Sequence, residues 1–349
     1  ADEGLQVLAD LLPDDLTSLE VELPASSQPS DAGVKVLLDR LEQQTGLVAF
    51  GMRCNMCAEL TGGTLQAVSA MLANHLDLTD LLLDFSMCVK VGDDGLAAIG
   101  KFLGDRAGEP PEEGQTAADA ELEGQAQKEK GPEFALLACL DLNFHGCLML
   151  SDDGLDKLVP GLTGARSCRV MRIDLGGLPA RATSSGFKNV FGAFATMSAL
   201  EELFLNVRGS AEVYESCLVT LCSALLAKEH MRSLHLNFHG CSGIATQSLF
   251  SFKDPLRSAM KLETIFLDFS ECTQIHDKGF QEICTCAKAL PGLKRFVLHI
   301  GGTQISNVGL ADLEQTMKGV PDVKISRAVK WAMSQGLTFK EKDTAAFGR

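Results

Sequence analysis

A period of 31 residues constrains this chain more than any other feature of its sequence. Residues 83–99, 142–158 and 267–283 share the pattern L-x-F-x-x-C-x-x-aliphatic-x-D-x-G-aliphatic. Positions equivalent to its first leucine recur at spacings of 31, 31, 59, 31, 32, 31, 31 and 31 residues. The nine markers are Val21, Met52, Leu83, Leu142, Ile173, Leu205, Leu236, Leu267 and Leu298. Such regularity indicates a repeat protein, in which each unit packs only on its neighbours.

Each unit changes its hydrophobic period in the way that a strand joined to a helix requires. Leu81 and Leu83 alternate with polar or outward positions, as in a short strand, and Leu96 begins an apolar stripe at helical spacing. Asp93 and Asp152 stand where a helix N-cap belongs. The sequence therefore predicts an α/β solenoid of about nine units, a horseshoe with parallel strands on its concave face and helices on its convex face.

The repeated string that begins at Cys88, Cys147 and Cys272 resembles the cysteine-containing class of leucine-rich repeats. The long unit with a full helix is also similar to the ribonuclease-inhibitor class. This resemblance covers nearly the whole chain and implies a leucine-rich-repeat solenoid. Many proteins of the cysteine-containing class are ubiquitin-ligase adaptors with an F-box ahead of the repeats, but only roughly twenty residues precede the first expected strand here.

Composition and charge exclude several classes of partner. A net charge of −15 opposes binding to nucleic acid, whose affinity comes mainly from Lys and Arg on phosphates. No apolar run reaches the roughly 18 to 20 residues that cross a bilayer, and the first residues lack the features of a secretory signal. We expect an intracellular protein in a reducing compartment, and the sequence does not distinguish cytoplasm from an organelle.

The cysteines recur at one repeat position just after the expected strand, which favours small buried thiols over bridges. The Cβ atoms of neighbouring cysteines on parallel strands would be separated by about the strand spacing of ~4.8 Å, beyond the ~3.8 Å between the Cβ atoms of a disulfide. Cys54 and Cys57 form a C-x-x-C pair, yet no second pair of zinc spacing accompanies it. We predict reduced thiols, no metal site and no cofactor.

The expected concave face carries polar and aromatic side chains between the buried strand positions. A regular row of Asp and Asn follows the markers, and we expect either mutual hydrogen bonds along the sheet or a polar recognition strip. Exposed aromatic and Arg side chains are stronger candidates for binding a partner than this row, since these residue types dominate interface energies. The predicted partner-binding residues are Arg172, Phe204, Asn206, Arg208, His235, Asn237, His239, Phe266, Asp268 and His299.

No motif in the sequence assembles a nucleophile, a base and an oxyanion site, so we predict no catalytic residues and no small-molecule substrate. The leading hypothesis is a non-enzymatic scaffold for protein partners, as a subunit or adaptor of a larger assembly. The ribonuclease-inhibitor resemblance leaves open a regulator of an enzyme, an inhibitor or a GTPase-activating protein, for which Arg53, Asn55 or Arg208 could act. An adaptor of ubiquitin ligases without an F-box is the third hypothesis.

Two segments depart from the repeat. Residues 105–133 are acidic, contain three prolines and few large apolar side chains, and are expected to form a disordered insertion that is either tolerated or partner-binding. We expect the solenoid to span 1–320, with an N-terminal capping helix, and a C-terminal cap and tail to span 321–349. Trp331, in that tail, is expected to lie over the last repeat or to belong to a docking segment.

Overall fold

Ten strands form one parallel sheet in sequence order in the computed structural model, which describes residues 2–106, 136–226 and 228–327. The strands are β1 (Ser18–Glu22), β2 (Ala49–Arg53), β3 (Asp80–Asp84), β4 (Cys139–Asn143), β5 (Val170–Asp174), β6 (Glu202–Asn206), β7 (Ser233–Asn237), β8 (Thr264–Asp268), β9 (Arg295–His299) and β10 (Asp322–Ser326). Each strand pairs in register with the next, so equivalent repeat positions form rows across the sheet.

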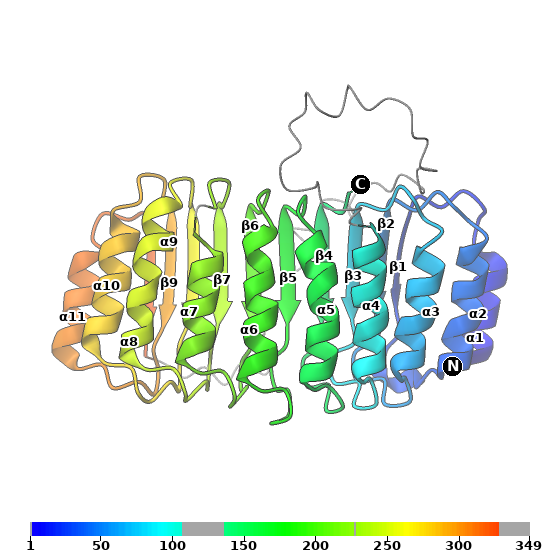
Figure 1. The fold of residues 1–349 in the computed structure, drawn as a ribbon, viewed down its shortest axis with the longest axis horizontal. Helices are drawn as coiled ribbons and strands as arrows, with labels where there is room; N and C mark the ends of the chain where they lie inside the picture. The colour runs from blue at the N-terminus through cyan, green and yellow to red at the C-terminus, as the bar shows by residue number, and fades with distance from the viewer. Residues whose placement is uncertain (1, 107–135, 227, 328–349) are drawn as a thin grey trace, which may run out of the picture.

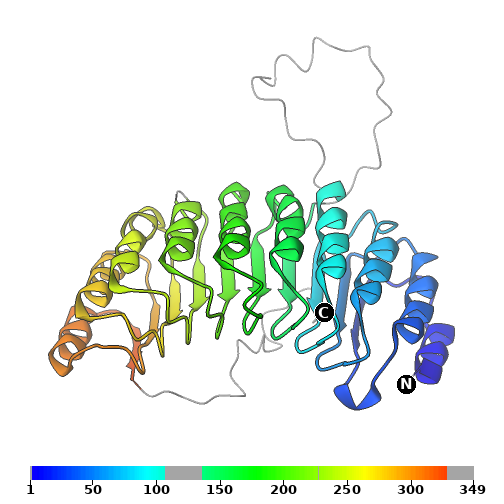
Figure 2. The ribbon, with the colours of Figure 1, turned by 60° about the horizontal axis from the view of Figure 1, so that its bottom comes forward.

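Helices cover the convex side of the sheet and leave its concave side open (Figure 1, Figure 2). The α-helices are α1 (Asp2–Leu11), α2 (Asp31–Glu42), α3 (Gly62–Leu72), α4 (Asp93–Arg106), α5 (Asp152–Gly164), α6 (Ser184–Ala193), α7 (Glu215–Ala224), α8 (Thr246–Leu249), α9 (Lys253–Ser258), α10 (Asp277–Lys288) and α11 (Asn307–Thr316). Short 3-10 turns are η1 (Ala25–Ser27), η2 (Phe194–Thr196) and η3 (Phe250–Phe252). The α/β solenoid predicted from the repeat is confirmed.

The core lies between the sheet and the helices. All nine markers are buried, and the residue two positions after the marker is a buried Phe in four units. The rings of Phe85 and Phe144 stack at 6.5 Å, and those of Phe238 and Phe269 at 5.5 Å. The aliphatic and aromatic side chains of successive units therefore pack in continuous lines along the axis of the solenoid.

The prediction that Asp93 and Asp152 cap their own helices is wrong. Asp152 is the first residue of α5, which is capped by Ser151. Its carboxylate instead accepts hydrogen bonds from the backbone N–H (2.7 Å) and hydroxyl (2.5 Å) of Thr183, which caps α6. Asp93 accepts the same pair of bonds from Ser151. These carboxylates link units because the parallel helices begin side by side, one unit apart.

A second kind of link joins the end of α4 to the preceding unit. The guanidinium of Arg106 donates to the backbone carbonyls of His75 (2.9 Å) and Leu78 (2.8 Å) in the preceding unit. Arg106 and Asp105 are the last residues of α4, so the insertion expected from residue 105 begins after Arg106. Residues 107–133 of that expected insertion lie outside the described residues.

The two ends of the solenoid differ. At the N-terminal end α1 packs on α2 and buries Leu5 and Ala9. At the other end the sheet gains a tenth strand, Asp322–Ser326, where the sequence predicted that the repeat stops after Val320. This strand has only two aliphatic side chains, so its hydrophobic pattern is weak. Trp331 lies outside the described residues.

Candidate interaction surface on the concave face

Five side chains form a continuous stack along the middle of the concave face, here called the aromatic row. The row consists of Arg172, Phe204, His235, Phe266 and His299, from β5 to β9. Its first four members occupy equivalent, paired positions on adjacent strands because strand side chains alternate. The parallel sheet therefore brings together residues that are about 31 positions apart in the sequence.

The spacing within the row is that of ring stacking. The guanidinium carbon of Arg172 lies 4.9 Å from the centre of the Phe204 ring, a cation–π distance. The rings of Phe204 and His235 stack at 4.2 Å, those of His235 and Phe266 stack at 5.9 Å, and His299 meets Phe266 edge-on at 5.3 Å. Each ring is thereby fixed by contact with its neighbours in the row.

Burial keeps the central histidine of the row neutral. It lowers the pKa of His235 to about 4, and the positive charges of Arg295 and Arg172 act in the same direction. Its Nε2 lies 3.2 Å from the hydroxyl of Ser233. At neutral pH His235 is therefore an uncharged ring that stacks between two phenylalanines.

The row of Asp and Asn beside the aromatic row holds the turns after the strands. The side-chain oxygen of Asn143, Asn206 and Asn237 accepts a hydrogen bond from the backbone N–H two residues later, and Asp84, Asp174 and Asp268 do the same. Mutual bonding along the sheet occurs between Asn206 and Asp174, at 2.7 Å. The principal role of this row is therefore the Asx turn, with mutual bonding as an additional feature.

The concave curvature buries part of the predicted site. Arg172, Asn206 and Asn237 are at most 7% exposed, whereas the sequence placed them on an open surface. The remaining members of the predicted set are half-buried, and Phe204 and Phe266, expected to be exposed, belong to this group. Curvature brings neighbouring side chains together on the inside of the arc, which reduces the exposed area of each.

Asp141 is a concave residue that the sequence analysis did not single out. It pairs in register with Arg172, it is 3% exposed, and its Oδ2 has no hydrogen-bond partner among the described residues. Burial raises its pKa to about 7, against the opposing effect of Arg172 and Arg53. Asp141 could have been identified from the sequence, because the alternation along the strands that predicts the aromatic row also places Asp141 beside it.

The repeat cysteines are buried donors. The thiol of Cys88 donates to the backbone carbonyl of Cys54 at 2.8 Å, and the thiol of Cys147 to that of Phe85 at 3.1 Å. Ser210 makes the equivalent bond in a unit that lacks the cysteine, at 3.2 Å. Burial raises the pKa of the Cys88 thiol to about 12, so it is a weak nucleophile at neutral pH.

Within the described residues, His, Cys, Asp and Glu side chains form no cluster of three or more that could hold a metal ion. None of the described helices has the length and apolar character that a bilayer span requires.

No family model and no curated protein matches the sequence. A crystal structure of a Rad7 and Elc1 complex in yeast is similar over 93% of this chain and 88% of that one, at 14% identity and a TM-score of 0.36. The leucine-rich repeat-containing protein LegL7 from Legionella pneumophila is similar over 91% and 95%, at 13% identity and a TM-score of 0.37. The 31-residue period and the parallel sheet, rather than these distant likenesses, define the fold as an α/β leucine-rich-repeat solenoid.

Proposed function

We propose that the concave face binds a protein partner and that the chain is a non-enzymatic interaction scaffold, a subunit or adaptor of a larger assembly. The aromatic row is the observation that carries this proposal. Ten strands spaced about 4.8 Å apart give a trough roughly 43 Å long, enough for a helix or for one side of a globular protein.

The aromatic row has the composition of a binding hot spot. Aromatic and Arg side chains supply most of the energy in protein interfaces, especially where they lie partly buried near the centre of the contact. Stacking also fixes the rings in advance, so little side-chain entropy is lost when a partner binds. We expect Phe204 and Phe266 to contribute most because both remain half-buried rather than fully covered.

The row of Asp and Asn after the strands supports binding rather than catalysis. The side-chain oxygens of this row of Asp and Asn already accept hydrogen bonds from backbone N–H groups of the turns, as Asp174 does from Gly176 at 2.9 Å. Its other carboxylate oxygen accepts from Asn206. The Asx residues thus shape the surface, and the selectivity for a partner comes mainly from the aromatic row.

Affinity capture from native lysate with matched variants tests the proposal. The intact chain is compared with Phe204→Ala/Phe266→Ala, and the control is Val219→Ala/Phe250→Ala, which removes exposed apolar side chains from the helical layer. We expect a stoichiometric set of proteins that the concave variant loses and the control retains. Circular dichroism of each variant checks that the solenoid is folded.

A deletion variant in the same experiment distinguishes binding by the concave face from binding by the insertion. A chain without residues 108–133 retains Arg106 and its bonds to the preceding unit. Partners that this deletion retains and the concave variant loses would support the proposal. Retention of every partner by the concave variant, with loss on the deletion, would instead assign binding to the insertion.

A further inference from the structure

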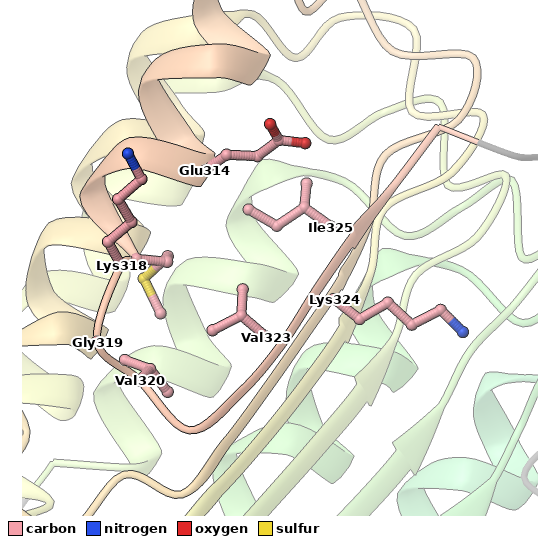
Figure 3. A pocket seen from close by; sticks show the side chains of 8 residues that line it. Glu314, Lys318, Gly319, Val320, Val323, Lys324 and Ile325 are labelled. Atoms are coloured by element: carbon pink, nitrogen blue, oxygen red, sulfur yellow. The ribbon is translucent and has the colours of Figure 1, made fainter.

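The C-terminal end of the solenoid contains an open pocket between α11 and β10, with a volume of about 410 Å³ (Figure 3). Val323 and Ile325 are directed from β10 toward the helix, whereas Lys324 is directed away from it. Met317 and Val320 complete the apolar lining. The pocket therefore opens onto the apolar layer that runs between the sheet and the helices.

The lining is less covered than the same layer one unit earlier. Phe296 and Leu298 of β9, which pair with Val323 and Ile325, are fully buried. Val323 and Ile325 are only half-buried, and β10 pairs with β9 alone within the described part of the chain. A solenoid end of this kind exposes core unless something caps it.

The chain leaves β10 at Ser326, the residue after Ile325, which lines the pocket. Arg327 donates to Oδ1 of Asn307 at 2.6 Å and to the carbonyl of Ile305, which ties the end of β10 to the start of α11. Trp331 follows four residues later and is the only tryptophan of the chain. Four residues span at most about 13 Å, the length of a five-residue strand, and the reversal itself uses part of that reach. A chain that turns back at Arg327 therefore brings Trp331 beside the end of β10, with Ile325 and Val323 within reach of its side chain.

We propose that the segment after Arg327 folds back over the pocket and that the indole of Trp331 packs on Val320, Val323 and Ile325, which line the pocket and are only half-buried. The indole suits the apolar lining and the open mouth of the pocket, because it is large and apolar and carries one polar N–H. The inference does not depend on the function proposed for the concave face.

The fluorescence of the single tryptophan tests the proposal in the full chain. We expect an emission maximum shifted to the blue of free N-acetyltryptophanamide and weaker quenching by acrylamide. Val320→Asp, which places a charge in the lining, is expected to shift the emission toward that of the free indole. Val308→Asp is the matched control, since Val308 lies on α11, is 71% exposed and does not line the pocket.

Three results would overturn the proposal. Emission and quenching equal to those of the free indole in the unmodified chain would show that nothing covers Trp331. Blue emission that survives Val320→Asp but is lost in Phe266→Ala would place the indole on the aromatic row. Blue emission that disappears on dilution would show that a second copy covers it.

Hydrogen exchange keeps the test informative if Val320→Asp unfolds the last unit. In the full chain carrying Trp331→Ala, we expect faster amide exchange between Met317 and Ser326 than in the unmodified chain, with unchanged exchange in β1 to β8. Equal rates between Met317 and Ser326 in the two chains would contradict docking of Trp331.

Discussion

At the scale of single residues, the repeat cysteines act as hydrogen-bond donors between units rather than as chemical groups. Cys147 is fully buried, and its thiol bonds the carbonyl of Phe85 in the preceding unit at 3.1 Å. Ser210 makes the equivalent bond through its hydroxyl, so a small donor of either kind serves at this position, although the unit of Ile173 has Leu178 there. This explains why cysteine recurs in a chain whose twelve cysteines are all free.

Cys147→Ala is therefore expected to destabilise the protein more than Cys147→Ser. The alanine removes one of two donors to the Phe85 carbonyl, which still accepts the backbone N–H of Cys88 at 3.1 Å. The loss is therefore that of one hydrogen bond, about 0.5–1.5 kcal/mol, whereas serine can keep the bond. Urea unfolding of both variants measures the difference, with Ser210→Cys as the reciprocal control. Equal losses for alanine and serine would mean that the thiol only fills space.

Lys228 gives the stability a dependence on pH. It is 3% exposed and donates to the carbonyls of Ala195 (2.9 Å) and Met197 (3.0 Å), and burial lowers its pKa from 10.5 to about 8. Between pH 8 and 10.5 the unfolded chain therefore holds a proton that the folded chain has released. The contribution of Lys228 to the free energy of unfolding should rise with pH by roughly 1 kcal/mol per unit in this window.

Urea unfolding at several pH values, with Lys228→Met as the reference, measures this contribution. The difference in unfolding free energy between the two proteins should change in favour of the wild type as the pH rises above 8. If the unfolding free energies of the two proteins change with pH in parallel, Lys228 keeps its proton in the folded chain.

At the scale of elements, several pairs of adjacent helices are joined through an Asp at the first residue of one helix, as α4 and α5 are by Asp93 and α5 and α6 by Asp152. Asp152 bonds the cap of α6, while its neighbour Asp153 is exposed and forms an ion pair with Lys157 at 2.6 Å. Asp152→Ala should cost about 1–3 kcal/mol, because backbone donors at the start of α6 lose their acceptor. Asp153→Ala should cost much less, because an exposed ion pair within one helix contributes little to stability. Thermal unfolding of the two variants compares them, and equal losses would contradict a link between helices.

The elements also show which features the sequence could predict. The period and the alternation of apolar residues predict the strands, the helices and the rows of the concave face, because each depends on the local pattern. The direction of the Asp152 carboxylate could not be predicted in this way, since its partner Thr183 lies one unit away. The burial of Arg172 and Asn206 depends on the curvature of the whole sheet, and β10 has too few aliphatic residues to stand out.

At the scale of the whole molecule, the solenoid has no single centre, because each unit contacts only its neighbours. Leu205 of β6 and Leu313 of α11 are both fully buried, but the first lies in a middle unit and the second in the last helix. Truncation of either to alanine should remove about 2–5 kcal/mol from its own unit. The two losses should therefore spread differently along the chain.

Hydrogen exchange along the chain distinguishes the two cases. Leu313→Ala should accelerate exchange in α11 and β10 and leave β1 to β7 protected, because an end unit can open without breaking contacts on both sides. Leu205→Ala should accelerate exchange in the units on both sides of β6, since the middle unit supports two neighbours. Uniform acceleration by both variants would mean that the solenoid unfolds as one cooperative unit, and its ends would then be as stable as its middle.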